Sequence, residues 1–212
     1  MARKLTIFGA FGVFLYVLHV VLGGWLWEGY SHLQQPISDL TAQGAQDRVL
    51  LTAITVLYGM FSIVFAVSVY LLLKRFAPKL ARIGALVFLV LHVVSITYGL
   101  FPQDAGGAAM TFQGIMHLVI TALIVPLTIL APLLIGFGLR KVPGFRNYGN
   151  YSIITGIFIL LAGGTTAIFF ANGWPYFGLV ERLNIGALQL WMLVSSIQFF
   201  TATIPLHKGA RH

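Results

Sequence analysis

The sequence contains no cysteine, and charged residues make up only 8% of its 212 positions. The absence of cysteine excludes disulfide bonds, thiolate metal sites and cysteine nucleophiles. A soluble globular domain carries about a quarter charged residues, so this scarcity excludes a soluble enzyme and a disordered chain. The net charge of +8 does not indicate a nucleic-acid partner, because the basic residues lie in small groups between apolar runs.

Apolar residues dominate, at 58% of the chain with a mean hydropathy of +0.91. A membrane-spanning helix needs about 20 predominantly apolar residues. Six uncharged runs of that kind cover roughly residues 5–27, 49–73, 80–101, 113–138, 151–171 and 183–206. The first run is too long for a signal-peptide core and lacks a small-residue cleavage site, so we expect it to stay in the membrane. We predict an all-α integral membrane protein with six transmembrane helices and one domain, residues 1–212.

The basic residues predict the orientation. Lysine and arginine collect on the cytoplasmic side of membrane proteins, and 11 of the 13 fall at the chain ends or in the second and fourth connections. Both termini are therefore predicted to be cytoplasmic, in a multi-pass protein of the cell membrane. All five acidic residues fall in the three connections on the other side, and they indicate an outward-facing polar site: Glu28, Asp39, Asp47, Asp104 and Glu181.

An internal repeat is one interpretation of the chain. The segment 17–21 (VLHVV) recurs at 90–94, which places His19 and His92 at one depth in two outward-running helices. Parallel repeats are known in membrane proteins, and sites form where the repeats meet. Three repeated helical hairpins would explain the recurrence, and chance similarity between apolar helices is the alternative.

The external connections hold most of the polar candidates. Residues 28–48 form a connection of 21 residues. Loops longer than about 12 to 15 residues without secondary structure are usually functional or disordered, so we expect this one to fold as a lid over the bundle. Ser38 and Asp39 lie within it, where a helix cap or turn is the alternative role. In the second connection, the glycines after Asp104 should let its side chain meet His117. In the third, we expect Glu181 and Arg182 to pair and anchor the last helix.

Three short motifs in this order resemble the bacterial and archaeal six-span family catalogued as domain of unknown function nine-nine-eight. They are residues 36–40 (PISDL), residues 101–104 (FPQD) with 114–117 (GIMH), and residues 178–182 (GLVER). The resemblance implies an integral membrane protein with motifs on the external side at Ser38, Asp104, His117, Glu181 and Arg182. It implies no particular reaction.

Two functional hypotheses follow, with membrane lipids and a hydrophobic small molecule as the expected partners. The first is a hydrolase-like or transferase-like enzyme for a lipid or isoprenoid, with catalytic candidates His117, Asp104, His92, Ser38 and Asp39. The second is a protein for binding, sensing or transport. In either case the ligand-binding candidates are Glu181, Arg182, His32 and Glu28.

The sequence also suggests two cofactors. Three imidazoles and a carboxylate could hold zinc and activate a water, with ligand candidates His32, His92, His117 and Asp104. His19 and His92 could instead bind haem axially, an alternative that we favour less because repeat symmetry explains their equal depth.

Overall fold

The computed structural model describes residues 1–202, and the described part is helical with no strand. Six helices are long and apolar enough to cross a membrane, which confirms the predicted fold class. The elements are α1 (Ala2–Leu5), α2 (Phe8–Leu26), η1 (Ile37–Thr41), α3 (Arg48–Phe76), α4 (Lys79–Ser95), η2 (Ile96–Gly99), α5 (Phe112–Leu139), α6 (Arg146–Asn172) and α7 (Phe177–Thr201).

The largest differences from the predicted boundaries are at three helix ends. Helix α4 ends at Ser95, six residues before the predicted 101, and the short helix η2 follows it to Gly99. Helix α6 begins at Arg146, five residues before the predicted 151, and α7 begins at Phe177, six before the predicted 183. The predicted run for α7 stops at the charge of Arg182, and that for α6 stops before the polar residues 147–150, whereas helical hydrogen bonding continues through both to the helix end. Glu181 and Arg182 are therefore helical rather than part of a loop. The predicted end of the last run at 206, together with Lys208 and Arg211, lies outside the described residues.

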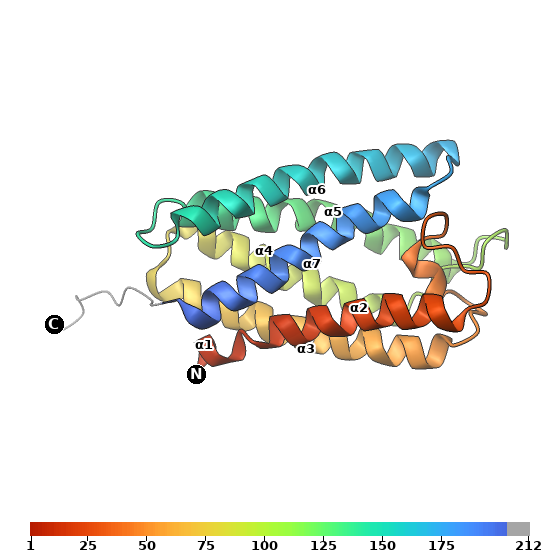
Figure 1. The fold of residues 1–212 in the computed structure, drawn as a ribbon, viewed down its shortest axis with the longest axis horizontal. Coiled ribbons are helices and arrows are strands. Elements are labelled where there is room, and N and C mark those ends of the chain that lie inside the picture. The colour runs from red at the N-terminus through yellow and green to blue at the C-terminus, as the bar shows by residue number, and fades with distance from the viewer. Residues whose placement is uncertain (203–212) are drawn as a thin grey trace.

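The six long helices form a ring in which each packs on its neighbours in sequence, and α7 closes the ring against α2 (Figure 1). The start of α1 and the end of α7 lie at the same end, where Arg3 donates to the backbone oxygen of Ala202 over 3.5 Å. We call this end, with the connections 77–78 and 140–145, the basic end. The opposite end, which carries the connections 27–47, 100–111 and 173–176, is the strap end. Which end faces the cytoplasm, and whether the hairpins are repeats, stay predictions.

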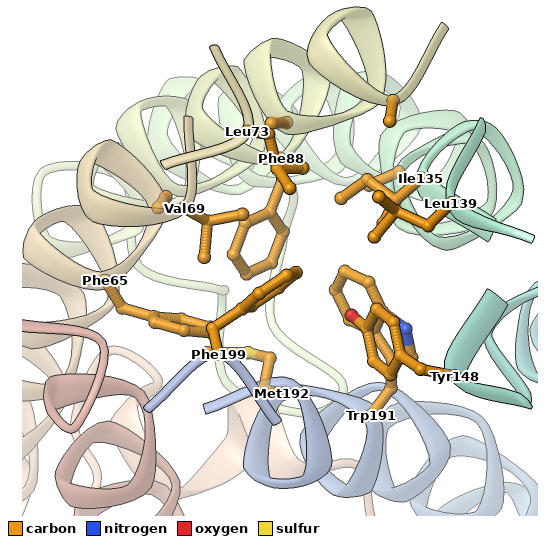
Figure 2. Close-up of a cluster of buried hydrophobic side chains, with 14 of the residues drawn as sticks. Phe65, Val69, Leu73, Phe88, Ile135, Leu139, Tyr148, Trp191, Met192 and Phe199 are labelled. Atoms are coloured by element: carbon orange, nitrogen blue, oxygen red, sulfur yellow. The ribbon is translucent and has the colours of Figure 1, made fainter. Parts of the chain in front are cut away.

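Large aromatic side chains fill the ring toward the basic end (Figure 2). Phe88 meets the Trp191 indole edge to face, with ring centroids 5.2 Å apart, and both side chains are fully buried. The Trp191 indole N–H donates to the Ser152 hydroxyl over 2.9 Å, so its polar group is satisfied within the bundle. This half is a tightly packed aromatic core.

The outer surface of the ring is apolar along its length. Large side chains on every spanning helix are more than a third exposed, among them Val17, Val56, Val90, Val119, Leu160 and Leu190. A soluble monomer rarely exposes apolar surface so continuously. This surface fits contact with lipid tails, in agreement with a multi-pass membrane protein.

Candidate functional site

The connection between α2 and α3, residues 27–47, lies over the end of the bundle and is held by α7 (Figure 1). We call it the strap. Arg182 donates from one guanidinium nitrogen to the backbone oxygens of Gln35 and Gly178, each over 2.9 Å, and from another to the Tyr30 phenol over 2.6 Å. The Tyr30 hydroxyl donates in turn to the backbone oxygen of Pro36 over 2.8 Å, and burial raises the pKa of Tyr30 to about 12. The predicted lid is therefore a fixed cover.

Glu181 binds the same strap. Its Oε2 accepts a hydrogen bond of 2.7 Å from the backbone N–H of Ile37, the first residue of η1. We predicted that Glu181 and Arg182 would pair with each other, but Glu181 bonds the strap, and Arg182 bonds the strap and Gly178 of its own helix. The anchoring of the last helix at the interface stays a prediction, and the structure adds a role in which α7 holds the cover.

The strap also contacts the connection between η2 and α5. The Gln103 amide accepts from the Ser38 hydroxyl and donates to Asp39 Oδ1 over 2.8 Å, so it bridges the two adjacent candidates. The backbone N–H of Gln43 donates to the backbone oxygen of Gln103 over 2.8 Å. Burial raises the pKa of Asp39. Sequence reasoning missed Gln103 as a functional residue, although it lies beside Asp104 in the quoted motif.

Asp104 ties its own loop together. It accepts from the backbone N–H of Thr111 over 2.8 Å, from the Thr111 hydroxyl over 2.6 Å, and from the Gln43 amide over 2.7 Å. The hydrogen bonds from Thr111 hold the pKa of Asp104 below its usual range, so the carboxylate is ionised at neutral pH. Thr111 also caps α5 by accepting from the N–H of Gly114 over 3.2 Å. Asp104 therefore has a structural role at the start of α5.

The expected Asp104 and His117 pair does not form a hydrogen bond. His117 Nδ1 lies 3.0 Å from the backbone oxygen of Phe101. The Asp104 carboxylate already accepts hydrogen bonds from Thr111 and Gln43, whereas the His117 imidazole meets the backbone just after η2.

The remaining candidates are separated from one another. His32 is exposed on the strap, with its ring 5.2 Å from that of Tyr30, and burial and the nearby Arg182 lower its pKa. Glu28 is exposed and His92 is buried within α4. Within residues 1–202, no three His, Asp or Glu side chains come together as metal ligands. The four zinc candidates therefore do not form such a cluster, and the haem alternative stays a prediction.

A second group of polar side chains lies inside the ring, and we call it the central polar cluster. Its members come from four helices: Tyr16 and His19 from α2, Tyr58 from α3, His92 from α4, and Gln189 from α7. The ring centroids of Tyr16 and Tyr58 are 5.2 Å apart, and those of Tyr58 and His92 are 6.3 Å apart. Gln189 donates to the Tyr58 hydroxyl over 2.9 Å. The sequence had indicated the two histidines but not the tyrosines between them.

Several buried polar atoms between the strap and the aromatic core have no partner within residues 1–202. They are both ring nitrogens of His19, Nε2 of His92 and Oε1 of Gln189, with Asn184 Oδ1 and Arg182 Nε nearer the strap. His19, His92 and Gln189 are 3%, 2% and 5% exposed. Burying a polar atom without a hydrogen bond costs about 1 to 3 kcal/mol, so such atoms are uncommon in proteins. Ser62 Oγ and Tyr151 Oη also lack a partner, and Tyr151 packs against the aromatic core, so the unpartnered atoms are more numerous toward the strap but are not confined to that half.

Comparison with known proteins identifies a family. Neither the curated proteins nor the solved structures contain a match to the chain. The family model described as protein of unknown function (DUF998) matches residues 10–198, from the start of the first spanning helix almost to the end of the last. The chain therefore belongs to the DUF998 family of polytopic membrane proteins.

Proposed function

We propose that this protein binds a neutral, lipid-soluble molecule in the strap half of the bundle, with the polar group of that molecule hydrogen-bonded to the central polar cluster. An alcohol or carbonyl compound of the isoprenoid kind has the matching chemistry. The cluster contains hydrogen-bond donors and acceptors but no carboxylate, lysine or arginine. A neutral polar group therefore suits it better than a charged one.

The unpartnered atoms of His19, His92 and Gln189 carry this proposal. In the interior of a membrane no bulk water satisfies such atoms, and polar residues inside membrane helices mark functional sites. A bound hydroxyl group can donate to Gln189 Oε1 and accept from an imidazole N–H, whereas a carbonyl group can only accept and therefore suits the histidines alone. The packing between the cluster and the basic end supports the same proposal. Phe88 packs against His92, with ring centroids 4.6 Å apart, and closes the site toward the basic end.

The strap supplies the control of access in this proposal. It covers the end of the ring above the cluster, and its bonds to Arg182 and Glu181 hold it closed. A molecule entering from that end would have to displace the strap, whereas one entering from the lipid would pass between helices. A strap of this kind keeps water away from a site that works by hydrogen bonding in an apolar surrounding.

The test is to identify small molecules that remain bound after gentle purification. We expect mass spectrometry of the organic extract to find a neutral lipid in the wild type at near-stoichiometric amount, and to find it strongly reduced in His19→Leu and Gln189→Leu. Tyr148→Phe is the matched control, because it removes a buried hydroxyl that bonds Ser195 over 2.6 Å in the aromatic half. An extract without such a lipid, or equal loss in all three variants, would contradict the proposal.

A lipid-processing enzyme is the second candidate, and Asp39 is the observation that favours it. Its carboxyl has a raised pKa and shares the Gln103 amide as a hydrogen-bond partner with the Ser38 hydroxyl, which places an acid and a hydroxyl in one small polar group. The test is turnover of candidate lipids by wild type and by Asp39→Asn, which keeps an oxygen acceptor for Gln103. Turnover lost in this folded variant would favour the enzyme, and unchanged lipids with both proteins would count against it.

A further inference from the structure

The basic end of the bundle contains a groove of about 500 Å³ that is separate from the strap and the central polar cluster. It is lined by residues from three helices and the connection between two of them, namely Leu80, Phe137, Arg140, Lys141 and Arg146. Three of the five carry a positive charge, and all three of these side chains are exposed. None of them donates a side-chain hydrogen bond to another described residue that would occupy it.

Close helix packing brings these charges together. A Cβ atom at Gly138 of α5 would lie 2.6 Å from the backbone nitrogen of Ala81 in α4, so only glycine permits this approach. Gly149 of α6 likewise lies against the backbone of Arg140. The two contacts fix the end of α5 between the starts of α4 and α6, and the groove is a consequence of that arrangement. Its charges are therefore held by the fold itself.

The charge in the groove has no acidic counterpart at this end. All five acidic residues of the chain lie at the strap end, in the strap, at the start of α3, in the loop before α5 or in the first turns of α7. Arginine guanidinium groups bind phosphate oxygens through two parallel hydrogen bonds, and lysine adds a point charge. A phosphate group is accordingly the ligand chemistry that the groove fits.

The apolar side of the groove indicates a lipid rather than free phosphate. Leu80 of α4 and Phe137 of α5 are each 40% exposed on the membrane-facing surface, and both line the same groove as the three basic side chains. A phospholipid places its phosphate at the level of helix ends and its acyl chains beside the helices. Free phosphate would make no use of the two apolar side chains.

We propose that this groove is a binding site for the headgroup of an anionic phospholipid, with Arg140, Lys141 and Arg146 bound to the phosphate and Phe137 and Leu80 against the first part of an acyl chain. The site goes beyond general attraction of basic loops to membranes, because it has defined walls from α4, α5 and α6. It is also independent of the function proposed for the strap half.

The experiment is native mass spectrometry of the full chain in neutral detergent, titrated with dioleoyl phosphatidylglycerol or dioleoyl phosphatidylcholine. We expect phosphatidylglycerol to bind the wild type with a defined stoichiometry and the triple variant Arg140→Gln, Lys141→Gln, Arg146→Gln to bind it about tenfold more weakly. The control Lys4→Gln, Lys74→Gln, Arg75→Gln removes the same charge from the same end and should keep the binding. Equal weakening in both variants, or equal binding of both lipids, would overturn the proposal.

A second arm separates the lipid from free phosphate. We expect inorganic phosphate at millimolar concentration to leave lipid binding nearly unchanged, and Phe137→Ser to weaken phosphatidylglycerol binding without altering the fold. Binding of inorganic phosphate that competes fully with the lipid and ignores Phe137→Ser would show a phosphate site instead, and would contradict the lipid assignment.

Discussion

The guanidinium group of Arg182 on α7 donates a hydrogen bond of 2.6 Å to the phenol of Tyr30 in the strap, across 152 positions of sequence. The same guanidinium also bonds the backbone oxygen of Gln35. The first turns of α7 and the strap therefore form one unit, in which a single planar side chain holds two points of an irregular segment.

Replacing Arg182 should loosen the strap without unfolding the bundle. We expect Arg182→Gln to lose charge-assisted hydrogen bonds worth about 2 kcal/mol, which corresponds to about 30-fold faster amide exchange in the strap. Arg182→Lys should rescue little, because one ammonium cannot reproduce a planar fork. Hydrogen exchange of peptides from residues 30–41 measures the effect.

The matched control for this measurement is Arg48→Gln at the start of α3, whose side chain makes no hydrogen bond to the described residues. Exchange in the strap that rises equally in both variants would mean that overall charge, rather than the Arg182 bonds, holds the strap.

Substitutions at Gly114 and Asp104 should have strongly non-additive effects on the free energy of unfolding. A Cβ at Gly114 would collide with the Asp104 carboxylate, although alanine is the better helix former. We expect Gly114→Ala to lower the free energy of unfolding by about 1 to 2 kcal/mol in the wild type and to raise it by about 0.5 kcal/mol in an Asp104→Ala background. Thermal unfolding in detergent gives both values. The same effect in both backgrounds would show that the carboxylate is not the obstacle.

The buried carboxyl group of Asp39 predicts that the stability of the strap depends on pH. Burial raises its pKa in the folded protein, so the unfolded chain ionises first as pH rises, and stability falls between the usual aspartate pKa and the raised one. The wild-type strap should accordingly be more stable below this window than at neutral pH.

Asp39→Asn should remove the part of that dependence that Asp39 contributes and stabilise the strap at neutral pH, because the amide oxygen still accepts from Gln103 without a buried charge. Hydrogen exchange of residues 30–41 between about pH 4 and 7, corrected for the intrinsic rates, checks this expectation. An unaltered pH profile in the variant would assign the effect to another group.

Trp191 should be among the largest contributors to bundle stability. It is 1% exposed and packs against Phe88, so Trp191→Ala leaves a cavity that costs about 3 to 5 kcal/mol. The neighbouring residue Leu190 is 54% exposed, so Leu190→Ala should change the unfolding midpoint in detergent far less. Similar losses from both variants would place the stabilising core elsewhere.

The sequence was sufficient to predict the six membrane helices, because an apolar run of membrane length has few other structures available in a bilayer. It also drew attention to polar residues that lie at one end of the bundle, including Ser38, Asp39, Asp104, Glu181 and Arg182, since polar residues stand out in so apolar a chain. The partners of these residues could not be predicted in the same way. Gln103 and Tyr30 carry no signal of their own, and they meet Ser38, Asp39 and Arg182 only after folding.

The sequence by itself determined the number of spans and the distribution of charge at their ends, because both depend only on local composition. The tertiary structure alone decided that Tyr16 and Tyr58 lie between two buried histidines, and that Arg140 and Arg146 share a groove. The physical reason is that lipid is as apolar as the bundle interior, so hydrophobic periodicity does not reveal which face of a membrane helix points inward. That choice is made by close packing, of the kind seen at Gly138, and by hydrogen bonds between helices.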